Sequence, residues 1–160
     1  MTKIIIDKEQ INEIERIEKS IITIEGFSLA ELITNGSFKN IYFFSETFLL
    51  RFDVIQLIYA NNIDVKDLYL IAHNNSDATT CIQVTDINEM GWDQIFDIDN
   101  TFVNIVYADY TTIFDETKKW LFFHKIDYPN ILFCNEKWDI PAALLKYLQT
   151  FEDAMAYFNN

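Results

Sequence analysis

The sequence predicts an α+β domain with a mostly antiparallel sheet, a C-terminal three-stranded meander, and packing helices at the N-terminal and C-terminal ends. Two observations lead to this fold class. Helical apolar spacing appears at both ends of the chain, and short β-rich runs separated by polar turns fill the part between them. Half of the 160 residues are hydrophobic, with only three glycines and two prolines. We therefore expect a single globular domain over residues 1–160 with a substantial core.

Two helix-start signals lie in the first part of the chain. Asp7 and Gln10 have the spacing of a capping box and precede a helix expected over about residues 8–19. A second capping box at residues 28–31, followed by Asn35-Gly36, predicts a short second helix. The apolar positions that define the face of the first helix are Ile11, Ile14, Ile17 and Ile21.

Three strands are expected in the next part. Residues 41–44 read as a buried strand, and residues 68–72 and 79–84 read as two strands joined by a polar hairpin connection. Residues 45–62 are ambiguous, because their helical spacing competes with a high content of β-branched residues. The spacing favours a helix that ends at Asn61-Asn62, on the apolar positions Phe48, Phe52, Ile55 and Tyr59.

The meander is expected over the following strands. Residues 102–114 are rich in Val, Ile, Tyr and Thr, which favours a strand. A polar turn at residues 115–119 leads into the apolar run 120–124, and a second turn leads into the run 131–134. Three strands joined by two short turns predict an antiparallel meander.

A last helix is expected at the C-terminal end. Asp139 has the position of an N-cap, and Pro141 falls in the first turn. The apolar residues that follow alternate four and three positions apart, which predicts one amphipathic helix of about 18 residues that buries this stripe. The stripe consists of Leu144, Leu148, Phe151, Met155 and Phe158.

Charge is distributed very unevenly. The net charge is −13, and the 51 residues from Asp67 to Thr117, here called the acidic segment, contain no Lys or Arg. Such a field attracts cations or a basic protein and repels nucleic acid and anionic membranes. We expect no nucleic-acid or membrane partner, and a monomer or weak dimer. The carboxylates of the segment are Asp67, Asp77, Asp86, Glu89, Asp93, Asp97, Asp99, Asp109, Asp115 and Glu116.

Two acidic motifs do not meet the requirements of known metal sites. An EF-hand loop that starts at Asp97 needs Gly at its sixth position and Glu at its twelfth, where this chain has Phe102 and Ala108. The Glu-x-Lys triplet at residues 116–118 has the form of a nuclease centre, but it lies in an expected exposed turn with no basic groove nearby. A small carboxylate-dependent, metal-using enzyme stays an alternative, with two of Asp97, Asp99, Asp109 and Glu116 at its centre.

The histidines and cysteines form no recognisable metal-binding or catalytic motif. His73, His124, Cys81 and Cys134 lack the spacing of a zinc site, and the two cysteines form no disulfide framework. We read them as core thiols and ordinary histidines; a Cys–His nucleophilic pair stays open, because such partners meet only in space. No cofactor or metal is expected. The N-terminus lacks a signal peptide, and no apolar run reaches the length of a membrane span, so we expect a cytoplasmic protein.

Aromatic residues inside the acidic segment suggest a protein interface. Trp and Tyr are enriched at interface centres, where they bury a large area at low entropic cost. We expect Trp92 or Tyr110 to act as the anchor, with carboxylates around it that meet basic residues of the partner. The predicted partner-binding set is Glu89, Trp92, Asp93, Asp97, Asp99, Asp109 and Tyr110.

Three features resemble the immunity proteins of bacterial polymorphic-toxin systems: the acidic stretch 86–116, the run 106–110, and Trp120 after the turn. The resemblance implies an inhibitor that binds a cognate contact-dependent or type VI effector, often a nuclease, and covers its basic active site. A third interpretation is an acidic scaffold or regulatory subunit that binds a basic protein other than a toxin.

Overall fold

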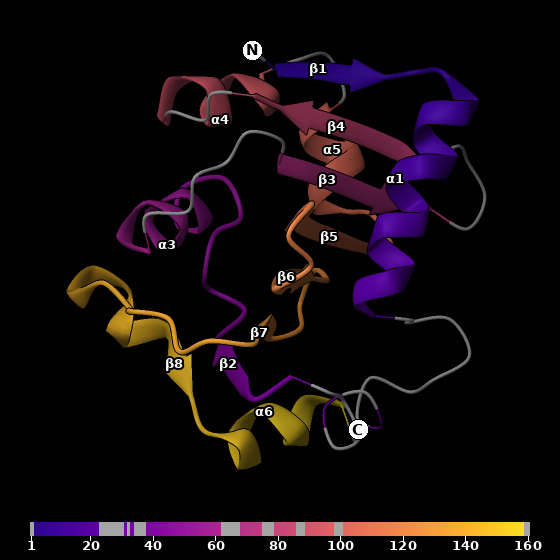
Figure 1. Ribbon diagram of the computed structural model, residues 1–160. Helices are drawn as coiled ribbons and strands as arrows, with labels where there is room; N and C mark the ends of the chain where they lie inside the picture. Colours follow the sequence, from indigo (N-terminus) through magenta and orange to yellow (C-terminus); the bar gives the residue numbers. More distant parts are fainter. Residues whose placement is uncertain are drawn as a thin grey trace.

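The computed structural model has one eight-stranded sheet, in which every neighbouring pair of strands is antiparallel (Figure 1). The strand order is β1-β4-β3-β5-β6-β7-β2-β8. The structure describes residues 2–22, 31, 33, 38–61, 68–74, 79–85, 89–97 and 101–158. The strands are β1 (Thr2–Ile5), β2 (Asn40–Phe44), β3 (Leu68–His73), β4 (Thr80–Val84), β5 (Tyr110–Asp115), β6 (Trp120–His124), β7 (Asn130–Cys134) and β8 (Leu148–Gln149).

Helices cover both faces of this sheet, so the fold has three layers. Successive side chains of a strand point to opposite faces, and the buried residues accordingly separate into two clusters. One cluster packs under α1 and α6 and defines the α1 face; the other packs under α3, α4, α5 and the 3₁₀ helix η1 and defines the α3 face. The helices are α1 (Lys8–Ile21), α3 (Val54–Ala60), α4 (Glu89–Ile95), α5 (Thr101–Val106), η1 (Ala142–Tyr147) and α6 (Phe151–Phe158).

The predicted fold class is confirmed, and so are several elements. The sheet is antiparallel, and β5, β6 and β7 form the C-terminal meander. Helix α1 starts at Lys8, as expected, and turns Ile14 and Ile21 into the core. Asp7 is its N-cap through its backbone, since its carbonyl accepts the Ile11 N–H at 3.0 Å, while its side chain makes no capping hydrogen bond. Residues 28–30 and 34–37, where a short helix was expected, lie outside the described residues.

The ambiguous stretch after β2 contains a helix, but a shorter one with a different buried face. Turns occupy residues 46–53 before α3 begins at Val54. Phe52 and Tyr59, which belong to the expected stripe, are therefore exposed, while Phe48 and Ile55 are buried. The late start of the helix sets its phase, and the buried face consists of Val54, Ile55, Leu57 and Ile58.

The expected strand over residues 102–114 is wrong in its first half. This part forms α5, and the chain then turns before β5 begins at Tyr110. The Thr111 hydroxyl donates to the Ile105 carbonyl at 2.8 Å and so closes the end of the helix onto the sheet. Short apolar runs of β-branched residues fit a buried helix or a strand equally well. In this chain the segment is a helix, and the packing of Ile105 into the core on the α3 face favours that conformation.

The prediction of one continuous C-terminal helix is also wrong. The C-terminal region is broken into η1, the two-residue strand β8 and α6. Leu148 is extended because it pairs with Phe44 at the edge of β2, where backbone groups are otherwise unpaired. Leu148 and Phe151 are consequently exposed, and Leu144 and Ala154 are the buried residues of this region.

Candidate functional site

Trp92 lies in the core and not on the surface, which corrects its predicted role as an interface anchor. Helix α4 turns its indole onto the α3 face, where it is completely buried. Its Nε1 donates to the Leu50 carbonyl at 3.3 Å. Trp120 is buried as well, whereas Tyr107 is exposed. A residue with no exposed surface cannot contact a partner without unfolding, so Trp92 is excluded as a contact.

Asp93 and Asp97 lie on the surface, but a basic residue from outside the acidic segment pairs with both. Arg51 donates from Nε to Asp93 Oδ1 at 2.6 Å and from Nη2 to Asp97 Oδ1 at 2.8 Å. The hydrogen bond from Arg51 holds the pKa of the Asp93 carboxyl below its ordinary value. Part of the charge of the acidic segment is therefore balanced within the fold, at these two carboxylates.

Tyr110 lies on the other face of the sheet from the helix that carries Asp93. The Tyr110 ring stacks between His73, at 4.4 Å between ring centroids, and Phe123, at 5.8 Å, on the α1 face. Asp109 is exposed just before β5, and its N–H donates to the His73 carbonyl at 2.9 Å. Glu89 is the first residue of α4, and its side chain lies outside the described part of the chain, as does all of Asp99.

A buried polar cluster that the sequence did not reveal lies beside Tyr110. The Glu18 carboxylate of α1 contacts Nε2 of His73 at 2.8 Å and accepts a hydrogen bond from the Thr112 hydroxyl. Glu18 is only 4% exposed. One signal could have found it: Glu18 lies four positions after Ile14 and three before Ile21, on the apolar face of the helix. The cluster holds α1 on the sheet.

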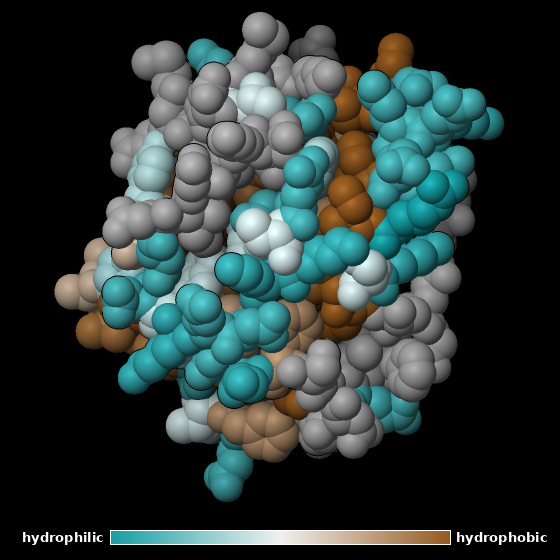
Figure 2. All heavy atoms as spheres, in the orientation of Figure 1, coloured by the Kyte–Doolittle hydropathy of each residue, from teal (hydrophilic) through white to brown (hydrophobic). Residues whose placement is uncertain are grey.

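A hollow of about 520 Å³, here called the α1 hollow, lies between the first half of α1 and the α1 face of β1, β4 and β3. The described residues that line it include four carboxylates and no Lys or Arg. At its side, the Tyr69 hydroxyl donates to Glu116 Oε1 at 2.9 Å. Figure 2 shows a stripe of hydrophobic residues beside the hydrophilic outer side of α1. The lining residues are Ile5, Asp7, Glu9, Gln10, Glu13, Ile14, Ile17, Tyr69, Gln83 and Glu116.

The α1 hollow combines the two surfaces that a basic side chain requires. Lys and Arg pack their aliphatic stems on apolar surface and keep the charged head beside polar groups. Ile5, Ile14 and Ile17 supply the apolar wall, and the carboxylates supply the acceptors. Glu13 already pairs with Arg16 at 2.7 Å, but both side chains are at least 70% exposed. Such an exposed pair is weak and is readily exchanged for a partner's cation.

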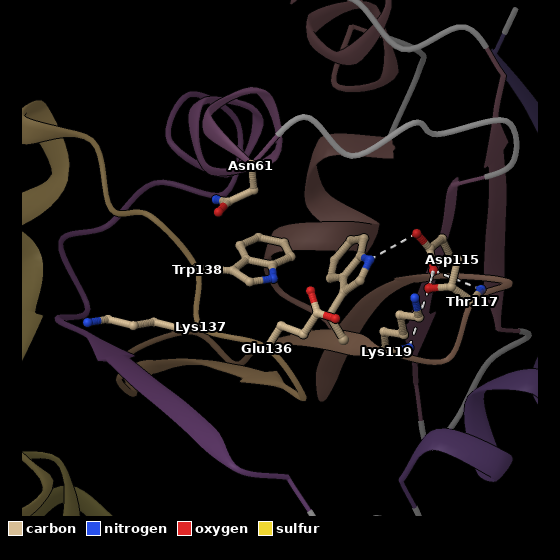
Figure 3. A pocket seen from close by; sticks show the side chains of 8 residues that line it. Asn61, Asp115, Thr117, Lys119, Glu136, Lys137 and Trp138 are labelled. Atoms are coloured by element: carbon tan, nitrogen blue, oxygen red, sulfur yellow. Dashed lines mark hydrogen bonds between the residues drawn. The ribbon is translucent and has the colours of Figure 1, made fainter.

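A second hollow, of about 290 Å³, lies on the α3 face and is walled by two indoles (Figure 3). The ring centroids of Trp120 and Trp138 are 5.2 Å apart. The buried Asp115 accepts from Trp120 Nε1 at 2.9 Å and from the Thr117 N–H at 3.0 Å, so its carboxylate is satisfied within the fold. Lys119 is also part of the lining, so this hollow is of mixed charge, unlike the α1 hollow.

The thiols and histidines occupy ordinary structural positions. Cys81 and Cys134 are free and buried, and burial raises the pKa of each thiol to about 12, so both stay protonated at neutral pH. Burial lowers the pKa of His124, whose Nδ1 lies 2.7 Å from Asn130 Oδ1. Within the described residues, no group of three potential ligands is arranged to hold a metal ion. No described helix is long and apolar enough to cross a membrane.

Comparison of the chain with protein-family models, with curated proteins and with solved structures gives no match. Its geometry and charge make the α1 hollow the candidate functional site of the described chain. Sequence reasoning did not find this site, because its carboxylates come from the start of the chain and from the end of β5. Only the strand order β1-β4-β3-β5 brings them together.

Proposed function

We propose that this chain is an immunity-type protein that binds a basic bacterial toxin in the cytoplasm of the producing cell and neutralises it by covering its active site. The observation that carries this proposal is the α1 hollow, in which Asp7, Glu9, Glu13 and Glu116 meet with no Lys or Arg among the described lining residues. A toxin that acts on nucleic acid has a basic cleft, because it must bind phosphates. An acidic hollow with an apolar wall is complementary to such a cleft.

The overall charge supports the same proposal. A chain with a net charge of −13 attracts a basic protein over long range, and electrostatic steering raises association rates to as much as about 10⁸ M⁻¹s⁻¹ at low salt. The same charge opposes self-association, so the chain acts as a monomer or weak dimer. Steering lets an inhibitor capture its toxin before the toxin reaches its substrate.

Co-expression tests the proposal directly. Each gene directly beside the gene of this chain is expressed in a bacterial host, alone and together with this chain. We expect one neighbouring product to arrest growth alone and to be tolerated when the chain is present, and the two purified proteins to form a complex. The proposal is contradicted if no neighbouring product is toxic, or if a toxic product arrests growth equally in the presence of the folded chain.

A further inference from the structure

Among the described strands, β1 forms an edge of the sheet, and this edge adjoins the α1 hollow. At one end of the strand order, β8 has only two residues and is continuous with η1 and α6. At the other end, β1 has four residues and pairs only with β4 among the described strands (Figure 1). An edge strand presents a row of backbone N–H and C=O groups that another strand can bind.

The side chains along this edge differ on its two faces. Ile5 is buried and lines the α1 hollow together with Asp7 and Glu9, which come two and four positions after it. Ile4 is 39% exposed and Ile6 is 87% exposed, so two large apolar side chains face solvent on either side of Ile5. A strand laid beside β1 would place alternate side chains on opposite faces, one set toward the hollow and the other toward the exposed isoleucines.

We propose that an extended segment of the basic partner adds to the sheet as a strand beside β1. The central residue of this segment is an Arg or Lys that lies opposite Ile5 and whose charged group reaches Asp7 and Glu9. The apolar residues on either side of it in the segment pack on Ile4 and Ile6. Backbone hydrogen bonds then supply affinity, and the alternating side chains supply specificity. This inference rests on the proposed function, and it adds the element that docks and the pattern that the partner must present.

Charge decides between a basic partner and a second copy of this chain as the occupant. Two copies would each bring a net charge of −13 to the contact, together with their own carboxylates beside β1. A segment with a basic residue between two apolar residues meets both surfaces of this edge. An antiparallel second copy could place its Lys3 opposite Ile5, but Lys3 has the polar Thr2 on one side, and the carboxylates of the two copies would repel each other.

The test uses a peptide of seven residues in which valine and arginine alternate, titrated into the ¹⁵N-labelled full chain. We expect saturable binding with shifts and slowed exchange of the β1 amides. Two further peptides are N-methylated, one on all arginines and one on all valines, so that their charges are unchanged. In a strand, the N–H groups of every second residue point to the same side, so either the arginine or the valine N–H groups face β1. The peptide whose β1-facing N–H groups are methylated should bind at least about tenfold more weakly than the parent peptide. The other methylated peptide should bind within about threefold of the parent peptide.

A matched pair of variants tests the contribution of the hollow. Asp7→Asn with Glu9→Gln removes two charges at the start of α1 and should weaken the parent peptide by about fivefold. Glu152→Gln with Asp153→Asn removes two charges at the start of α6 and should leave binding unchanged. Equal binding of both methylated peptides, or no saturable binding of the parent peptide, would overturn strand addition. Neither result depends on whether the wild-type chain protects cells against the toxin. Strand addition and the proposed immunity function can therefore fail separately.

Discussion

The Glu18 carboxylate lies 2.8 Å from Nε2 of His73, although 55 residues separate them along the chain. Glu18 projects from the inner face of α1, and His73 is the last residue of β3. The contact joins the helix that walls the α1 hollow to the middle of the sheet. Because Glu18 is buried, this pair sets both the position of α1 and part of the stability of the domain.

A double-mutant cycle measures that coupling. His73→Leu leaves a buried carboxylate with only Thr112 as its described partner, and should lower the free energy of unfolding by about 3 kcal/mol. Glu18→Leu combined with His73→Leu should cost less than the sum of the two single changes, since no unpaired charge remains. Urea denaturation of the four proteins gives the coupling energy. Additive effects within about 0.5 kcal/mol would show that the pair is not coupled.

Replacement of Trp92 should act on stability. Trp92→Ala removes a fully buried indole and its hydrogen bond to Leu50, and should cost about 3–5 kcal/mol. Trp92→Phe keeps most of the ring volume and should cost clearly less. The measurement is the urea midpoint, followed by near-ultraviolet circular dichroism. A loss below about 1 kcal/mol in the alanine variant would mean that the indole is not packed as described.

Two adjacent leucines in η1 provide a matched comparison. Leu144 is 1% exposed and Leu145 is 54% exposed. Leu144→Ala should lower the free energy of unfolding by about 2–5 kcal/mol, and Leu145→Ala should change it by no more than about 0.5 kcal/mol. Thermal and urea melts of both variants check this. A reversed order would place the other side of η1 against the sheet.

The Arg51 contacts predict a dependence of stability on pH. The pKa of Asp93 is lowered in the folded state, so the stabilisation is fully present above the pKa of about 3.9 in the unfolded chain and is lost as the pH falls through the lowered value. Arg51→Gln should therefore reduce the urea midpoint at pH 7, and the deficit should shrink below about pH 4. Lys137→Gln, which removes an exposed cation elsewhere, should show no such change. A deficit that is independent of pH would contradict the pairing.

The sequence predicts elements well where a periodic pattern is long or where turns delimit it. Helix α1 and the meander are of this kind. It does not predict α5 or the break at Leu148, because both depend on tertiary contacts: the packing of Ile105 and the pairing with Phe44. Where the local sequence has no strong preference for helix or strand, contacts with residues far away along the chain determine the secondary structure.

The candidate site was predicted less well than the fold. Net charge suggested an acidic binding surface, but the acidic segment is contiguous only in sequence. Arg51 pairs with part of it, Trp92 is buried, and Tyr110 lies on the other face of the sheet. The α1 hollow takes Asp7 from the start of the chain and Glu116 from the end of β5. Such grouping depends on strand order, which no local pattern encodes.

Growth protection by matched charge reversals tests the proposed function most directly. Glu9→Lys with Glu13→Lys reverses two exposed charges at the α1 hollow, and Glu152→Lys with Asp153→Lys reverses two exposed charges on α6. Each pair changes the net charge equally and includes a carboxylate in the first turn of a helix, so the effects of net charge and of the helix dipole are comparable. With both variants confirmed as folded, cells that express the toxic neighbouring product should die with the α1 variant and survive with the α6 variant. Equal protection by both would contradict the assignment of the α1 hollow as the surface that binds the toxin.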